Sequence, residues 1–271
     1  SISTRNIVKK DFSWTTDFIF SHTTSEVTDL DAQSRIISMI SGSGFTKKGY
    51  PYRALFSINF QGLNNRGLPT FINENGEKTV SNHFFQSYDL SHLVYEGPTD
   101  PTITGSFGNI FKYKNLSLNV FITYSGGNVV RLDPTFASAY SDLSAMPREF
   151  INRWTKPGDE AFTNIPAIAD LRQIQNDTRL AYAYNAYNYS TARTASGDFI
   201  RMKEISVGYE FPARLVRHLG INSLGMKLQG TNLFLIYTDK KLNGQDPEFM
   251  NAGGVALPTP RQFTLTLRLG I

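Results

Sequence analysis

The C-terminal stretch Arg261-Gln-Phe-Thr-Leu-Thr-Leu-Arg-Leu-Gly-Ile271 decides the class of fold. Apolar residues occupy every second position of it, and polar residues or glycine stand between them. Successive side chains of a β-strand point to opposite faces, so the stretch predicts a strand with one apolar and one polar face. The apolar face consists of Phe263, Leu265, Leu267, Leu269 and Ile271.

Six further segments repeat this period of two. Each is about 9–11 residues long, which is the length of a tilted membrane strand. The least regular is 199–209, because Arg201 and Lys203 share a parity with Phe199 and Val207. The segments are 11–20, 53–61, 105–113, 116–125, 199–209 and 224–231.

The connections between these segments are of two kinds. Lys114-Asn115 is a tight hairpin and 212–222 reads as a short helical turn, whereas 62–104, 126–198 and 237–260 are long and rich in Gly, Asn, Asp and Pro. Short turns at one end and long loops at the other are typical of an outer-membrane β-barrel. The segment 22–51 does not fit this alternation, and its strand content stays open.

An alternative fold is a soluble β-sandwich, whose strands also alternate between a packed and a wet face. Its strands usually have only about 5–6 residues. The function that goes with it is a soluble or surface-anchored glycan-binding module without transport.

Composition narrows the class of protein. Aromatic residues make up 13% of the chain, and no apolar run reaches the roughly 18 residues of a membrane helix. There is no cysteine, hence no disulfide, and the net charge of +4 is spread without basic clusters, which argues against nucleic-acid binding. The first residues lack an apolar signal-peptide core, so we expect any export signal to lie outside this chain.

Several motifs resemble those of the SusC/RagA family of TonB-dependent outer-membrane transporters. The main one is Ser196-Gly-Asp-Phe-Ile-Arg-Met-Lys-Glu-Ile-Ser-Val-Gly-Tyr-Glu-Phe-Pro212. The others follow the family's order and cover nearly the whole chain: Asp11-Phe-Ser-Trp14, Gly67-Leu-Pro-Thr-Phe71, Arg153-Trp-Thr-Lys-Pro-Gly158, Gly230-Thr-Asn-Leu-Phe234 and Gly244-Gln-Asp-Pro-Glu248.

The resemblance implies that residues 1–271 form the C-terminal portion of a barrel of 22 strands, supplying about seven to nine of them. The plug domain, the TonB box and the remaining strands would lie outside this chain. The implied function is TonB-dependent import of an oligosaccharide or peptide across the outer membrane of a Gram-negative cell. The implied partners are TonB, a SusD-like surface lipoprotein that forms a lid, and membrane lipid.

No catalytic constellation is present, and we expect no enzyme, metal or cofactor. The four histidines, His22, His83, His92 and His218, lack metal-ligand spacing. The acidic segments 29–31 and 73–77 lack the spacing of a calcium loop.

Two groups of side chains are candidates for binding. Tyrosine offers an apolar ring with a polar tip, and asparagine both donates and accepts, so an outward loop over 180–190 could contact a sugar, a peptide or a lid protein. The alternatives are a loop that packs its own aromatic rings and a strand that extends above the membrane. The candidates there, with a tryptophan expected in a cap over the barrel, are Tyr182, Tyr184, Asn185, Tyr187, Asn188, Tyr189 and Trp154. Strand parity and the resemblance together predict that five polar side chains face the lumen and the plug: Asp17, Asn59, Lys227, Gln229 and Arg268.

Overall fold

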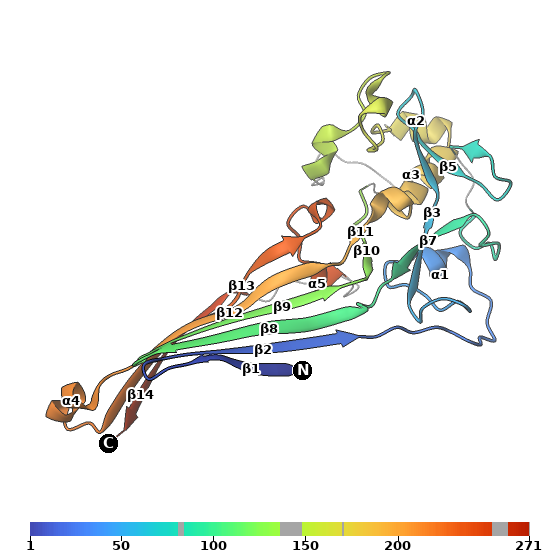
Figure 1. Ribbon diagram of the computed structural model, residues 1–271. Helices are drawn as coiled ribbons and strands as arrows, with labels where there is room; N and C mark the ends of the chain where they lie inside the picture. The colour runs from blue at the N-terminus through green and yellow to red at the C-terminus, as the bar shows by residue number, and fades with distance from the viewer. Residues whose placement is uncertain (81–83, 136–147, 170, 251–259, 271) are drawn as a thin grey trace.

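The computed structural model describes residues 1–80, 84–135, 148–169, 171–250 and 260–270 (Figure 1). Ile271, predicted on the apolar face, lies outside these residues. No helix in the described part of the chain is long and apolar enough to cross a membrane.

A long antiparallel sheet of seven strands forms one part of the molecule, in the order β1-β2-β8-β9-β12-β13-β14. Within the described residues, β1 and β14 each pair with one neighbour in this sheet, so the sheet is open. The strands are β1 (Ile2–Val8), β2 (Phe12–His22), β8 (Ile103–Tyr113), β9 (Leu116–Gly126), β12 (Phe199–Glu210), β13 (Ser223–Thr238) and β14 (Gln262–Gly270).

The register of the sheet separates apolar from polar side chains. One transverse row consists of residues directly opposite one another, all apolar: Trp14, Phe111, Leu118, Val207, Leu228 and Leu265. The next row, on the opposite face, holds Ser13, Lys112, Ser117, Gly208, Lys227 and Thr266. The two-faced strands predicted from the sequence are therefore confirmed.

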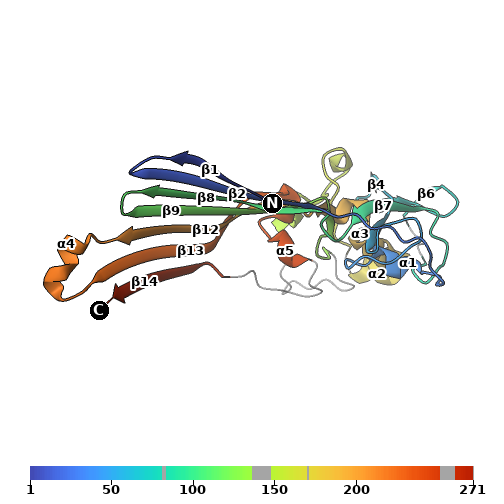
Figure 2. The ribbon, with the colours of Figure 1, turned by 60° about the horizontal axis from the view of Figure 1, so that its bottom comes forward.

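The apolar face is bare. Phe263 is 72% exposed and Leu265 is 61% exposed, and Figure 2 shows the sheet as a single layer. In a β-sandwich this face would be covered by the second sheet, so the alternative fold is wrong.

A β-bulge explains the irregular parity of 199–209. The pairing of β12 with β9 shifts between Met202 and Glu204, which places Lys203 in the bulge. One extra residue reverses the alternation. Arg201 is thereby placed on the polar face, while Val207 further along the strand points to the apolar face.

One predicted barrel strand is in a different place. Residues 54–58 form β3 (Ala54–Ile58), which pairs with β7 (Leu93–Pro98) outside the seven-stranded sheet and is buried on both sides. The seventh strand is instead β1, which the sequence did not reveal.

The segment 22–51 is part of a single long connection. Because 53–61 does not cross the sheet, residues 23–102 form one insertion between β2 and β8, and 22–51 is the first part of that insertion. The segment 22–51 contains one short helix, α1 (Ile36–Ile40).

The described residues of 23–102 and 127–198 build a compact unit at one end of the sheet, which we call the loop domain (Figure 1). Its core joins α1, β3, β5 and α3 through residues such as Ile40, Ile58, Phe71 and Tyr187. Its other strands are β4 (Phe60–Leu63), β5 (Pro69–Ile72), β6 (Lys78–Thr79), β10 (Val129–Arg131) and β11 (Thr194–Ser196). Its other helical turns are η1 (Arg148–Asn152), η2 (Asp159–Ala161), α2 (Leu171–Asn176), α3 (Arg179–Asn188) and η3 (Thr191–Arg193).

The connections are sorted between the two ends of the sheet, as predicted. The connection from β13 to β14 contains η5 (Lys240–Leu242) and α5 (Pro247–Met250). These two elements lie at the same end of the sheet as the loop domain. The far end carries the short turn with α4 (Ala213–Val216) and η4 (Arg217–Leu219).

Candidate ligand-binding site in the loop domain

The predicted loop over 180–190 is mostly helix. The helix α3 buries Leu180, Ala183, Tyr184 and Tyr187, which have the spacing i, i+3, i+4 and i+7 of one helical face. The sequence contains this helical spacing, but the repeated Tyr and Asn residues suggested a binding loop instead. The prediction of a loop is therefore wrong, because the segment packs as an amphipathic helix.

Three of the candidate side chains on this segment lie inside the loop domain. Tyr187 is 2% exposed and meets the Phe60 ring edge-on at 5.6 Å between centroids. Burial raises the pKa of Tyr187 to about 12. The Asn188 side-chain oxygen accepts the Thr135 backbone N–H at 2.9 Å, and Tyr184 is also buried.

The remaining three candidates on this segment are more accessible. Tyr182 is 64% exposed and Asn185 is also exposed. Tyr189 is half-buried, with its ring edge-on to Phe85 at 5.7 Å. A binding role for these side chains stays a prediction.

Trp154 and Tyr184, which are thirty positions apart, line the same cavity of about 720 Å³. This volume is in the range of small-molecule sites. Leu68 and Leu180 also line the cavity and pack with Tyr184 in a small core of their own. The other lining residues are Asn64, Arg66, Lys78, Thr79, Val80, Ala167, Ile168, Gln173, Asn176, Asp177 and Arg179.

Both aromatic walls are held in place. The Trp154 indole N–H donates to Glu160 Oε2 at 2.8 Å, and this bond lowers the pKa of the Glu160 carboxyl. A Cβ at Gly67 would stand 2.4 Å from the indole ring, and its φ of +72° also favours glycine. The Tyr184 hydroxyl donates to the Ala167 carbonyl at 2.7 Å.

The charge in the cavity is positive. Asp177 is the acidic lining residue among those described, and Arg179 donates to both of its oxygens, at 2.8 and 2.9 Å. The bond from Arg179 lowers the pKa of the Asp177 carboxyl, and the nearby charge of Arg66 lowers it further. Arg66 and Lys78 are exposed and form no ion pair with any residue in the described ranges.

Four of the five side chains predicted to face the lumen lie on the polar face of the long sheet. Asp17 is on β2, Lys227 and Gln229 are on β13, and Arg268 is on β14. Lys227 forms an ion pair with Glu204 at 3.7 Å on the same face. Asn59 is not among them: it lies between β3 and β4 in the loop domain, so its assignment to a barrel strand is wrong.

A buried ion pair ties the connection between β13 and β14 to the polar face. Arg201 donates to both oxygens of Asp246, at 2.5 and 2.6 Å, and also lies 3.1 Å from Glu248. The side chains of Arg201 and Asp246 are 6% and 7% exposed. Sequence reasoning missed this pair, although the two residues belong to two of the motifs quoted above.

Two further buried arginines stabilise the loop domain. Arg131 donates to the carbonyl oxygens of Ser190, Ile40 and Phe56, and so joins β10, α1, β3 and the end of α3. Arg193 pairs with Glu149 at 2.5 Å. Burial lowers the pKa of Arg131 to about 10, so the guanidinium stays charged at neutral pH.

Across the residues that the structure describes, no three His, Cys, Asp or Glu side chains are grouped to hold a metal ion.

Comparison with known proteins identifies the class of the chain. The sequence is 24% identical over 271 residues to TonB-dependent receptor P3 of Formosa agariphila, and this alignment covers 92% of the chain. TonB-dependent receptor P39 of the same organism is 23% identical over 310 residues, with 95% of the chain covered. The chain is related to TonB-dependent receptors.

The fold agrees with the relationship to these receptors. The structure of the RagAB peptide transporter matches 98% of the chain with a TM-score of 0.70 at 19% identity. The long sheet thus has the fold of the matching part of the RagAB transporter, and the predicted resemblance to the SusC/RagA type is confirmed.

The match covers only part of each relative. The chain spans about a quarter of the length of the receptors, 24% of P3 and 28% of P39, and 28% of the RagAB chain. No protein-family model matches the sequence.

Proposed function

We propose that this chain is the C-terminal part of an outer-membrane barrel that imports an oligosaccharide or peptide with energy from TonB. The apolar face of the sheet would contact lipid and the polar face would line the lumen. The loop domain would stand on the extracellular side, where a SusD-like surface lipoprotein would close over the barrel. The remaining strands, the plug and the TonB box would come from parts of the protein outside residues 1–271.

The observation that carries this proposal is the bare apolar face of an open, single-layer sheet. Long rows of exposed Phe and Leu are costly in water, and a lipid bilayer is the environment that stabilises them. The exposed residues on this face include Phe107, Leu116, Val207, Leu228, Phe263, Leu265, Leu267 and Leu269.

The side chains of Asp17, Lys227, Gln229 and Arg268 lie on the opposite face, where they would contact a plug. They lie on strands at both sides of the sheet, so a plug in the lumen would be held by dispersed polar contacts. Such contacts are individually weak, and a pulling force could break them in succession.

The plug contact can be tested by cross-linking, because this chain has no native cysteine. Cysteines at Gln229 and Arg268 of the full-length protein would be paired with cysteines scanned across the plug. We expect cross-links in the resting state. Leu228→Cys and Leu267→Cys, which point to the apolar face, are the matched controls. Equal cross-linking from both faces would contradict the proposed contact.

Transport is tested in cells that carry the full-length protein. We expect uptake of the nutrient with TonB present and its loss when TonB is deleted. A surface lipoprotein should co-purify from detergent-solubilised membranes. Uptake that is unchanged without TonB would overturn the proposal.

A further inference from the structure

We propose that the cavity between Trp154 and Tyr184 is a subsite for an acidic oligosaccharide, whose carboxylate or sulfate groups meet Arg66 and Lys78. This inference rests on the proposed import function, because it names the substrate class that the loop domain would select.

The lining of the cavity carries an excess of positive charge. Arg66 and Lys78 come from two separate segments, the turn between β4 and β5 and the start of β6, yet both line one hollow. The one described carboxylate there is already engaged by Arg179. The lining therefore holds three basic side chains, Arg66, Lys78 and Arg179, against the one carboxylate of Asp177. A concave wall with such an excess of positive charge attracts anions and raises their local concentration.

The aromatic walls of the cavity are rigid. Trp154 is fixed by its bond to Glu160 and by its close packing on Gly67. A fixed aromatic wall can pack against the apolar C–H face of a sugar ring with little loss of side-chain entropy. The amide side chains of Asn64 and Asn176, also in the lining, can donate to and accept from hydroxyl groups.

The same walls suit a peptide less well. Extended peptides are commonly held by adding a strand to an exposed sheet edge. The edge strand beside this cavity is β6, which has only two residues. A peptide would therefore gain few main-chain hydrogen bonds, whereas a sugar chain needs none.

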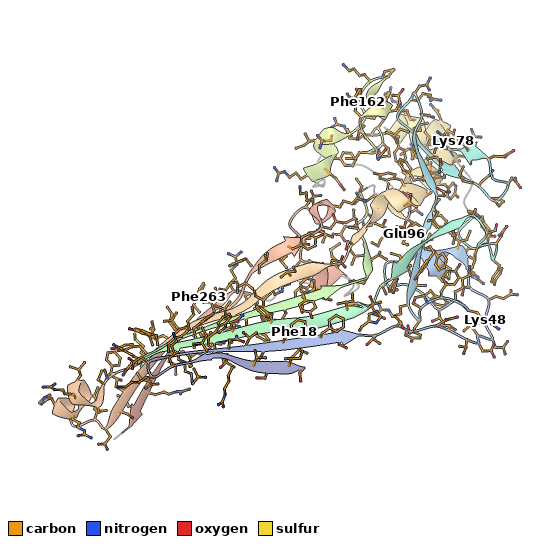
Figure 3. All side chains as sticks on the ribbon, viewed as in Figure 1. Phe18, Lys48, Lys78, Glu96, Phe162 and Phe263 are labelled. Carbon is orange, nitrogen blue, oxygen red and sulfur yellow. The ribbon has the colours of Figure 1, made fainter. Side chains whose placement is uncertain are left out.

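Lys48 provides a matched control for the basic residues of the cavity. It is exposed on the loop domain, does not line the cavity, and lies well away from Lys78 (Figure 3). Its contact with Asp29 is long, at 3.7 Å, and both side chains are exposed, so replacing it removes one positive charge with little effect on stability.

The test is direct binding to the purified full-length protein in detergent. The probes are a galacturonic acid tetrasaccharide, a sulfated tetrasaccharide, neutral maltotetraose and tetraglutamate. We expect one or both acidic sugars to bind, and the comparison between them separates carboxylate from sulfate recognition. Arg66→Gln with Lys78→Gln should weaken that binding about tenfold or more, whereas Lys48→Gln should leave it unchanged.

Three outcomes would overturn the inference. They are equal binding of maltotetraose, tighter binding of tetraglutamate, and a double variant that binds as the wild type does. Trp154→Phe, which keeps a ring but not the bond to Glu160, tests the wall without emptying it and should also weaken sugar binding. TonB-dependent uptake of some other nutrient, measured separately, would preserve the import function even if the cavity bound no acidic sugar.

Discussion

Single buried residues of the loop domain connect segments that are distant in the sequence. Arg131 is buried, and its guanidinium bonds three carbonyl oxygens from segments that are far apart in the sequence. A buried charge is costly unless it is well hydrogen-bonded, so these contacts fix how the segments meet. Tyr187 acts similarly through packing, with its ring against Phe60 in the main core.

The raised pKa of Tyr187 predicts a loss of stability at high pH. The phenol ionises near pH 10 in the unfolded chain and at about 12 in the folded one. Above pH 10 the unfolded state releases its proton first, so the contribution of Tyr187 to stability falls by roughly 2 to 3 kcal/mol as pH rises from 10 to 12. Limited proteolysis of the loop domain between pH 10 and 12 should show this loss of stability as faster cleavage. Tyr187→Phe should reduce the pH dependence, and an unchanged slope would contradict this assignment.

At the scale of elements, the apolar face of the sheet contains one polar cluster. The Trp14 indole N–H and the Thr16 hydroxyl both donate to Asn109 Oδ1, at 2.9 and 2.8 Å. Asn6 from β1 donates to Thr16 at 2.6 Å, and Thr4 donates to Asn6 at 2.9 Å. Polar groups facing lipid are tolerated when they satisfy one another, and these bonds link β1, β2 and β8.

Asn109→Leu should destabilise the barrel despite being more apolar. It leaves the Trp14 N–H and the Thr16 hydroxyl without their shared acceptor, at a cost of about 1–3 kcal/mol. Denaturant unfolding of the full-length protein in detergent or vesicles measures the change.

A triple variant tests whether the lost hydrogen bonds cause the destabilisation by Asn109→Leu. Trp14→Phe, Thr16→Val and Asn109→Leu together remove the donors along with their shared acceptor, and should recover most of the lost stability. If Asn109→Leu were as stable as the wild type, the cluster would have no structural role.

At the scale of the whole molecule, the long sheet is open at both edges within the described residues. An exposed edge presents unpaired backbone N–H and C=O groups, and here both edges flank a bare apolar face. The chain as described therefore has an unfavourable surface in water.

Residues 1–271 expressed alone should consequently associate in detergent-free buffer. The full-length protein should remain monodisperse in detergent, where micelles cover the apolar face. Size-exclusion chromatography with light scattering distinguishes the two. A monodisperse monomer of residues 1–271 in plain buffer would contradict the barrel assignment.

Alternation along the sequence was enough to predict six of the seven strands of the long sheet, their two faces and the sorting of long and short connections. Those features follow from alternation along one strand, where each side chain's face depends only on its own position. The prediction failed at 53–61, whose alternating residues are buried on both sides, and at 180–190, where a helix packs into a core.

Only the tertiary structure decided which residues meet in the loop domain. The cavity joins residues as distant as Asn64 and Tyr184, and the ion pair joins Arg201 to Asp246. Such contacts depend on how irregular segments fold back over one another, which no local period encodes. The difference is one of range. The two faces of a strand follow from near neighbours in the chain, whereas the candidate site depends on packing between distant segments.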